Sequence, residues 1–250
     1  MGFCPVDSTV SLSVVSHAQA PLVQALLEDL RQFRGVTLEV TLTLNMPESL
    51  PFNADSYPFP VRVLRNARPR GFGANHNAAY ASSPAPYFCV LNPDIRLPLD
   101  PFPALVPRLH NPLIAAVAPL IRSPAGEIED SARRFPTPLS LAMKLIAGGP
   151  RPEFPAPREP FMPDWIAGMF MLFRGDAFAA VGGFDEGYFL YYEDVDICAR
   201  LRAAGLRVEV NPEAAAVHGA RRESHRKGRY LLWHLSSMAR FFGKRLLGRI

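Results

Sequence analysis

Short apolar segments alternate with segments of helical spacing along the first 90 residues, and this alternation limits the fold more than any other feature. Residues 10–15 (VSLSVV) and 87–91 (YFCVL) are rich in β-branched or aromatic side chains, which is typical of buried strands. Residues 21–33 repeat leucine at helical spacing. Strands that alternate with helices predict a mostly parallel sheet with helices on its faces, which is an α/β fold.

The remaining elements continue this pattern less regularly. Further strands are expected at residues 36–44, 61–64, 115–120, 165–173 and 206–210. Helices are expected at residues 71–81 after a glycine-containing turn, and at 176–181, 194–204 and 230–247, with Gly35 and Gly205 as helix ends. Residues 123–135 are expected as a loop or hairpin, and the proline-rich residues 150–163 as a loop.

Size and charge restrict the class of protein. With 250 residues, 48% of them hydrophobic and 20% charged, the chain suits one globular domain with a sizeable core, or one domain with an appendage. Residues 221–250 hold nine Lys and Arg and one acid, a net charge of +8, so residues 1–220 carry −4 of the total of +4. This basic, amphipathic tail suits a solvated face, nucleic acid or an anionic membrane surface.

Cysteine usage and the N-terminus indicate the compartment. The three cysteines, Cys4, Cys89 and Cys198, have no CxxC spacing, so we expect neither a disulfide framework nor a structural zinc site. The N-terminus has no basic region followed by an apolar run, and no signal peptide is expected. The longest apolar run, residues 165–173, is about half the ~20 residues of a membrane span. We therefore expect a reducing, cytoplasmic compartment.

Two polar motifs follow strands of the first half. Residues 70–77 (RGFGANHN) open a helix, where glycine lets the backbone approach a phosphate, but His76 stands where a dinucleotide fingerprint has its third glycine. Asn92-Pro93-Asp94 follows a buried strand, where a carboxylate suits a hard cation together with substrate phosphates. Both motifs are also explained by ordinary turn chemistry.

A third motif crowds three acids into four positions. Glu193, Asp194 and Asp196 follow an aromatic run, residues 188–192, and begin a helix. One acid explains a helix cap, and we expect Asp196 to supply it. A carboxylate beside an apolar wall has the raised pKa of a general base, which suits the other two. His218 is a metal ligand only if Asp94 holds a metal, and is otherwise a structural histidine.

Together these stretches resemble a family 2 inverting glycosyltransferase of the GT-A fold, most closely the bacterial rhamnosyltransferase-like members. The matching stretches are RGFGANHNAA, VLNPDI, residues 165–219 and RYLLWHLSSMARFF, so the resemblance covers about residues 10–245. Its most specific part is residues 165–218, where Gly-Gly-Phe-Asp-Glu, the aromatics, Glu-Asp-x-Asp, the helix, Pro-Glu and His follow in the family's order.

The resemblance implies a domain plan and residue roles. The fold is a Rossmann-like, mixed and mostly parallel sheet flanked by helices, over residues 1–220, with a nucleotide-sugar half at about 1–120 and an acceptor half at about 121–220. Residues 221–250 form a basic amphipathic C-terminal helix. Asp194 is the expected catalytic base, and Glu193 orients the base or the acceptor. Asp94 and His218 are expected to hold Mg²⁺ or Mn²⁺ on the diphosphate.

The same resemblance implies the binding residues. Those expected for the nucleotide sugar are Ser16, Asn45, Asn66, Arg70, Gly71, Gly73, Asn75, Asn77, Asn92 and Asp94. Those expected for the acceptor are Trp165, Gly168 and Tyr192. The chain departs from the family at Asn92, which replaces the first Asp of the common Asp-x-Asp and weakens the expected metal site. It also departs at residues 44–47 (LNMP), which replace a base-reading signature and leave the base unassigned.

The expected reaction is transfer of rhamnose or another hexose from a nucleotide-diphosphate sugar, in cell-surface polysaccharide or lipopolysaccharide assembly. dTDP-rhamnose is the donor that the resemblance implies, with UDP- and GDP-sugars as alternatives. The acceptor is a saccharide or a lipid-linked glycan, and the tail docks on the inner face of the plasma membrane. We expect no nucleic-acid partner. A nucleotide- or dinucleotide-binding oxidoreductase and a non-catalytic glycan-binding module of transferase-like fold are the alternatives.

Overall fold

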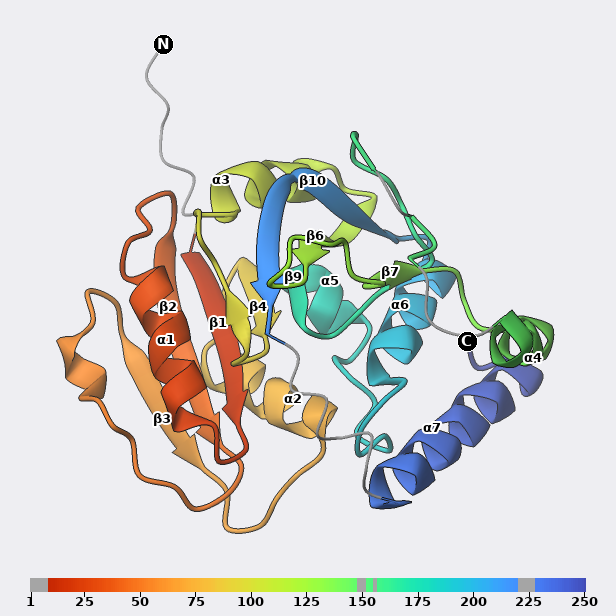
Figure 1. The fold of residues 1–250 in the computed structure, drawn as a ribbon, viewed down its shortest axis with the longest axis horizontal. Helices are drawn as coiled ribbons and strands as arrows, with labels where there is room; N and C mark the ends of the chain where they lie inside the picture. Colours follow the sequence, from red (N-terminus) through yellow and green to blue (C-terminus); the bar gives the residue numbers. More distant parts are fainter. Residues whose placement is uncertain (1–8, 148–151, 155–156, 220–227) are drawn as a thin grey trace.

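The structure, a computed structural model, describes residues 9–147, 152–154, 157–219 and 228–250. Its centre is an eight-stranded sheet with the order β3-β2-β1-β4-β9-β6-β10-β5 (Figure 1). Cys4, part of the expected 150–163 loop and residues 221–227 of the basic tail lie outside the described residues. Cys89 and Cys198 are free, buried thiols.

The first half of the chain forms the parallel part of the sheet. Its strands are β1 (Thr9–Ser16), β2 (Thr37–Leu44), β3 (Val61–Arg65) and β4 (Tyr87–Leu91), with α1 (Ala20–Leu30), the short η1 (Ala54–Ser56) and α2 (Phe72–Ser82) between them. These elements confirm the α/β prediction. Gly35 is not the predicted helix end, because α1 ends at Leu30 with Arg31 at its C-cap.

The second half of the chain completes the sheet. β9 (Phe170–Arg174) runs antiparallel between β4 and β6 (Ile114–Arg122), and β10 (Arg207–His218) runs parallel to β6. β5 (Ile95–Arg96) pairs antiparallel with the end of β10 and closes the sheet edge. The helices of this half are α3 (Phe102–Leu105), η2 (Val106–His110), α4 (Pro138–Ala147), α5 (Gly175–Ala180), α6 (Glu193–Ala203) and α7 (Gly228–Leu246).

Two strand predictions were wrong in extent. The strand predicted at 165–173 is divided into β8 (Trp165–Ile166), which pairs with β7 (Ala132–Arg133), and β9, because a turn at residues 167–169 changes the chain's partner. The strand predicted at 206–210 continues to His218. Residues 211–213 lie inside β10, where a register shift between Asn211 and Ala215 absorbs them as a bulge.

Each face of the sheet carries one hydrophobic core. Alternate residues of β1, Val10, Leu12 and Val14, pack in the first core with leucines of α1. Phe88 and Val90 of β4 point to the opposite face, into a second core that contains residues of α5, α6 and α7. Phe241 of α7 is fully buried there, so the C-terminal helix packs against the body of the molecule.

α7 and α4 lie together at one side of the molecule. In Figure 1, α7 runs diagonally across the lower right, and α4 is drawn next to its C-terminal end. The guanidinium of Arg245 on α7 lies 6.0 Å from the ring centre of Phe135, which precedes α4 in the chain. No helix among the described residues is both long enough and apolar enough to span a membrane.

Candidate active site

The first turn of α6 carries Glu193 and Asp194. The backbone of Tyr192, at the N-cap, is left-handed with φ of 66°, and that of Tyr191 before it has φ of 71°. Asp194 is fixed by two backbone donors: the N–H of Gly168 donates to Oδ2 at 3.0 Å and the N–H of Val195 to Oδ1 at 2.8 Å. The turn between β8 and β9 therefore holds the carboxylate of Asp194 in place.

Burial changes the proton affinity of both carboxyls. The pKa of Asp194 is raised by burial, although the N–H groups of Gly168 and Val195 and the charge of Arg133 act to lower it. The pKa of Glu193 is raised well above its ordinary value by burial and by the neighbouring charge of Asp194. Glu193 Oε2 has no hydrogen-bond partner among the described residues. A carboxylate whose pKa is raised by burial is suited to accept a proton from a substrate hydroxyl.

This pair lines a cavity of about 1170 Å³. Of the predicted site residues, the structure brings Trp165, Tyr192, Glu193, Asp194 and His218 to its wall. Gly168 does not line it, although its N–H bonds Asp194. The wall also contains residues that the sequence did not single out: Arg133, Arg134, Phe135, Ser140 and Leu141 around α4, and Tyr230, Leu231 and His234 of α7.

Arg133 is a cation of the cavity wall that the sequence did not single out, and its charge acts to lower the pKa of Asp194. Its guanidinium is bound to Asp130 at 2.8 Å and lies 5.2 Å from the ring centre of Trp165. β7 carries Arg133, and its pairing with β8 sets Arg133 opposite Trp165. Residues 123–135 were predicted as a loop or hairpin, but the sequence did not indicate the partner strand, because a strand of two residues has no periodicity to recognise.

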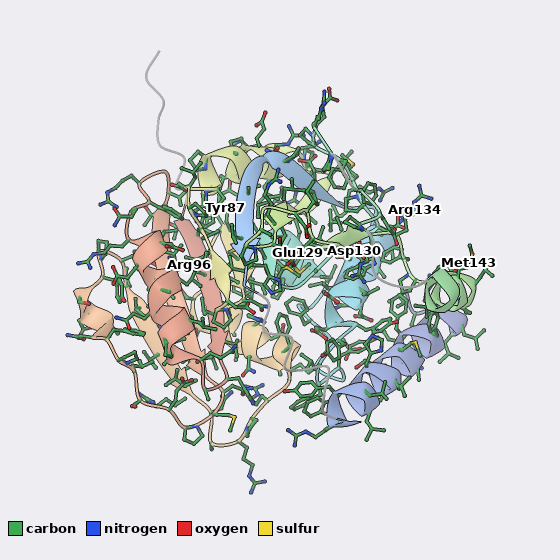
Figure 2. The ribbon with its side chains drawn as sticks, in the orientation of Figure 1. Tyr87, Arg96, Glu129, Asp130, Arg134 and Met143 are labelled. Atoms are coloured by element: carbon green, nitrogen blue, oxygen red, sulfur yellow. The ribbon has the colours of Figure 1, made fainter. Side chains whose placement is uncertain are left out.

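The pairing of β5 with β10 places Asp94 beside His218. His218 Nε2 lies 3.4 Å from Asp94 Oδ2, and Nδ1 lies 2.8 Å from Glu129 Oε2. Burial lowers the pKa of His218, but the hydrogen bonds and charges of Asp94 and Glu129 outweigh it and raise the pKa to about 8. Glu129, which the sequence did not single out, lies near the centre of the molecule in Figure 2.

The side chains of Asp94 and His218 are of the types that bind divalent cations. Asp94 Oδ1 is buried and has no hydrogen-bond partner among the described residues, and carboxylate oxygen with imidazole suits Mn²⁺ or Mg²⁺. The described residues contain no group of three or more His, Cys, Asp or Glu already arranged around a metal position. The local protein donors are therefore few, which leaves room for ligands from a substrate.

The predicted nucleotide residues form a hydrogen-bonded cluster where β1, β2 and β3 end. Asn45 Oδ1 accepts from Asn66 Nδ2 and from the N–H of Arg70, both at 2.8 Å, and Asn66 Nδ2 also donates to Asn75 Oδ1 at 2.7 Å. The backbone of Asn45 bonds Ser16, whose Oγ accepts from the N–H of Gln19. None of these residues lines the 1170 Å³ cavity.

Three other predicted nucleotide residues hold α2 against residues 184–189. Asn77 bonds the backbone N–H and C=O of Phe184 through its side-chain amide. A Cβ on Gly73 would lie 2.6 Å from Phe184 Cβ, and one on Gly71 would lie 2.9 Å from the carbonyl oxygens of Tyr188 and Phe189. Glycine is needed at both positions for close approach of the backbone.

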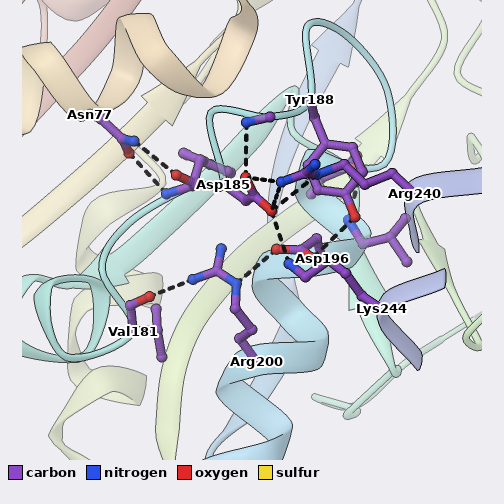
Figure 3. A network of polar contacts seen from close by, with 12 residues as sticks. Asn77, Val181, Asp185, Tyr188, Asp196, Arg200, Arg240 and Lys244 are labelled. Carbon is purple, nitrogen blue, oxygen red and sulfur yellow. Dashed lines mark hydrogen bonds and ion pairs between the residues drawn. The ribbon is translucent and has the colours of Figure 1, made fainter. Parts of the chain in front are cut away.

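Asp196 does not cap α6 as predicted. It is fully buried, and it accepts from Tyr188 OH at 3.2 Å and from Arg200 Nε at 2.7 Å while contacting Lys244 of α7 (Figure 3). The N-cap is Tyr192, and its side chain makes no capping bond. The reason is geometric: Asp196 points away from the helix end into the contact between α6 and α7, where two cations require a counter-charge.

Three comparisons relate the chain to known proteins. A family model described as the N-terminal domain of galactosyltransferase matches residues 154–226. The chain is 32% identical to rhamnosyltransferase WbbL of Escherichia coli over 187 residues, which is 70% of this chain and 71% of that protein. It is 35% identical to the N-acetylglucosaminyl-diphospho-decaprenol L-rhamnosyltransferase of Mycobacterium tuberculosis over 158 residues, 59% of this chain and 50% of that protein.

The fold also matches a solved structure. The crystal structure of GalNAc-T7 with UDP, GalNAc and Mn²⁺ superposes with a TM-score of 0.67 at 17% identity, over 86% of this chain and 44% of that chain. At this identity the match shows the fold alone. The chain therefore spans about half the length of the mycobacterial protein and of GalNAc-T7, and about seven tenths of the E. coli protein.

Proposed function

The chain belongs to the family 2 glycosyltransferases of the GT-A fold, and we propose that it transfers a hexose, with inversion, from a nucleotide-diphosphate sugar to an acceptor hydroxyl in cell-surface polysaccharide synthesis. The single observation that carries the proposal is the pair Glu193 and Asp194, two carboxyls with raised pKa at the wall of one large cavity. The relatives favour neither the oxidoreductase nor the non-catalytic module.

Asp194 is the base in this proposal. It takes the proton of the acceptor hydroxyl while that oxygen bonds the anomeric carbon from the face opposite the nucleotide, and the bond from that carbon to the diphosphate oxygen breaks. The products are the glycosylated acceptor and the nucleotide diphosphate, with the proton on Asp194. Glu193 stays protonated and buried, so that Asp194 alone carries the negative charge of the pair.

Asp94 and His218 would hold a divalent cation, Mg²⁺ or Mn²⁺, and the unpartnered Oδ1 of Asp94 supports this assignment. When bound, such a cation neutralises the charge that develops on the leaving diphosphate. Asn92 replaces the acid that would otherwise add a ligand, so we expect loose binding of the ion. Addition of EDTA is expected to abolish transfer and excess Mn²⁺ to restore it; unchanged transfer in EDTA would remove the metal from the proposal.

The nucleotide sugar is proposed to bind where β1, β2 and β3 end, at Ser16, Asn45, Asn66, the 70–77 segment and Asn92. Ligands of open α/β sheets bind beyond the carboxyl ends of the strands, which supports this placement. dTDP-rhamnose is the proposed donor, because the E. coli and M. tuberculosis relatives described above carry rhamnosyltransferase names. A thermal-shift screen of dTDP-, UDP- and GDP-sugars, with and without Mn²⁺, tests the choice, since a ligand that binds only the folded state raises its apparent stability.

The acceptor is proposed to bind in the cavity, against Trp165 and Tyr192 and near Gly168. A lipid-linked saccharide is supported by the mycobacterial relative, whose name specifies a diphospho-decaprenol acceptor, and by apolar side chains such as Leu141, Phe154 and Leu231 in the wall. The guanidinium groups of Arg133 and Arg134 in the same wall suit an anionic group of such an acceptor.

Exposed leucines support docking of α7 on an anionic membrane at the cytoplasmic face. Leu231, Leu232 and Leu235 are 61%, 67% and 46% exposed, and Leu139 and Met143 of the neighbouring α4 are 71% and 60% exposed. The basic composition of residues 221–250 adds attraction to anionic lipid. We expect binding to phosphatidylglycerol vesicles but not to phosphatidylcholine vesicles, lost in Leu232→Ser/Leu235→Ser and kept in Leu99→Ser, an exposed leucine outside α4 and α7. Equal binding by all three proteins would reject the surface.

The decisive test of the reaction is Asp194→Asn. This change is expected to lower transfer about 10²–10⁴-fold, the usual contribution of a general base, and to leave donor binding intact. Asp55→Asn, at an exposed aspartate in η1, is the matched control and should transfer normally. Transfer by Asp194→Asn at close to the wild-type rate would show that another group is the base.

A further inference from the structure

The backbone directly before the acid pair is strained. Tyr191 and Tyr192 have φ of 71° and 66°, and Ala18 is the one other non-glycine residue with positive φ among the described residues. The left-handed region is unfavourable for bulky L-residues, and such conformations persist only when their surroundings enforce them. Two consecutive tyrosines in this region therefore need an outside support.

Helix α7 supplies contacts to every residue of this strained segment, residues 189–192. Trp233 stacks on Phe189 with ring centres 4.6 Å apart, and Ser237 Oγ donates to the carbonyl of Leu190 at 2.9 Å. The ring of His234 lies against both tyrosines, at 5.3 Å from Tyr191 and 5.4 Å from Tyr192. α2 adds one backbone hydrogen bond at the start of the segment, from the N–H of Phe72 to the carbonyl of Phe189 at 2.9 Å, and α7 supplies the ring contacts to the two tyrosines.

Charged contacts fasten α7 at both ends of the segment. Lys244 Nζ donates to Asp185 Oδ2 at 3.0 Å, before the segment, and contacts Asp196, after it. Arg240 also donates to Asp185 at 2.9 Å (Figure 3). Lys244 is 15% exposed and Asp196 is fully buried, so this contact is largely shielded from water and salt. Lys244 thus bridges the loop before the strained segment and the helix after it.

We propose that α7 is a positioning element of the active site, which holds Tyr191 and Tyr192 in the left-handed conformation and thereby aims Glu193 and Asp194 at the cavity, with Lys244 as its anchor. The inference rests on the proposed role of Asp194 as base. It gives the C-terminal helix a part in transfer that is separate from membrane docking: its leucines face outward, whereas His234, Ser237 and Lys244 face the catalytic segment.

Hydrogen exchange tests the positioning without any assay of activity. Lys244→Met in the full chain leaves Asp196 with Arg200 and Tyr188, so the fold should persist. We expect amides of residues 188–195 to exchange at least ten times faster, while those of β1 and β4 stay unchanged. Arg249→Met, at an exposed cation after α7, is the control and should match the wild type. Equal protection of residues 188–195 in both variants would overturn the proposal.

Kinetics then separate positioning from general stability. Lys244→Met is expected to lower kcat about 10-fold with the donor KM within about two-fold of the wild type, because the base is misplaced while the nucleotide half is unaffected. Lys244→Arg, which keeps the charge, should recover most of the loss. An unchanged kcat in Lys244→Met, or a KM effect alone, would contradict the role of the anchor.

A double-mutant cycle tests whether the backbone conformation carries the effect. Glycine adopts positive φ without strain, so Tyr191→Gly removes the need for support at that residue. In the Tyr191→Gly background, Lys244→Met should lower kcat at least three-fold less than in the wild-type background. Additive losses would show that α7 does not act through this conformation. If Asp194→Asn itself transfers normally, the base assignment fails, while the exchange result still reports on the positioning.

Discussion

In the region where we propose that the nucleotide sugar binds, which is called the nucleotide half below, Asn45, Asn66 and Asn75 form a set of amide hydrogen bonds with the backbone of Arg70. In the catalytic half, Glu193 has an unpartnered buried oxygen and follows two strained tyrosines. This asparagine cluster is satisfied by its own hydrogen bonds, whereas the segment that leads to Glu193 has a strained backbone that α7 contacts. We therefore expect the two regions to respond differently to substitution.

The largest change in stability is expected at Asp196, whose ion pairs join α6 to α7. Asp196→Ala would leave Lys244 and Arg200 without their shared buried counter-charge, and loss of one member of a buried ion pair typically costs about 3–5 kcal/mol. Urea unfolding should measure a loss of this size in the free energy of unfolding. Asp196→Leu with Lys244→Met removes both charges of that contact and should recover part of it. A loss below about 1 kcal/mol in Asp196→Ala would mean that the network contributes little.

The next prediction concerns Glu193 and pH. Because the pKa of Glu193 in the folded chain lies above that of the unfolded chain, the folded state binds more protons between the two values, and stability falls as pH rises through this range. Glu193→Gln has no proton to lose, so it should remove this slope and make the fold more stable than the wild type at pH 8, by about 1.4 kcal/mol for each unit by which folding raises the pKa. Little gain is expected at pH 4. Thermal unfolding of the wild type and of Glu193→Gln at the two pH values measures this gain in stability. A variant less stable than the wild type at pH 8 would contradict the raised pKa of Glu193.

The pKa of Asp185 is shifted in the opposite direction to that of Glu193, so Asp185 serves as an internal control for the pH dependence of stability. Burial would raise its pKa, but the N–H of Gly187 and the cations Lys244 and Arg240 lower it to about 2. Its contribution to stability is therefore present above the unfolded value of 3.8 and is lost as pH falls from there to about 2. Asp185→Asn should be less stable than the wild type at pH 7, and the difference should shrink below pH 3.

The nucleotide half offers a smaller loss with a different readout. Asn45→Ala removes the acceptor for Asn66 and for the N–H of Arg70. A buried donor that loses its partner costs about 1–3 kcal/mol of stability. We expect a stability loss near the lower end of this range, with a weaker donor affinity and a kcat close to that of the wild type. Asp55→Ala, at an exposed side chain of η1, is the control. A loss confined to kcat would break the division between the two halves.

The sequence predicted the central sheet well because its cause is local. The β-branched and aromatic runs of β1, β2 and β4 need no knowledge of distant partners to be recognised as buried strands. The sequence also singled out Glu193 and Asp194, since three acids in four positions exceed what a cap requires; the structure places both at the cavity wall, and their role stays a prediction. In contrast, the segment 165–173 is divided into two strands because β8 pairs with β7, which is distant in the sequence. Glu129 lies beside His218 because of the path of a loop, and a loop has no periodic pattern to recognise.

The part played by α7 and the partner of Asp196 also lay beyond sequence reasoning. A helix with leucines on one stripe predicts one apolar face, but α7 uses a second stripe, with Ser237 and Phe241, for the core. Asp196 looks like a cap because it lies in the first turn, yet its partners Lys244 and Tyr188 are 48 and 8 residues away. Tertiary contacts decided both features, and no local propensity encodes them.

The smallest effect tests how tightly α7 is packed. A Cβ added to Gly243 would meet no atom within 4 Å, so Gly243→Ala should stabilise the chain by about 0.5–1 kcal/mol through helix propensity. The same substitution at Gly73 should instead destabilise it, because its Cβ would lie 2.6 Å from Phe184 Cβ, where the nucleotide half packs against the catalytic segment. Thermal unfolding of the two variants measures both the gain and the loss of stability. If Gly243→Ala also leaves kcat unchanged, the proposed positioning depends on the contacts of the stripe with Ser237 and Phe241, and not on the stiffness of α7. A change in kcat of several-fold would assign part of the effect to flexibility of the helix at Gly243.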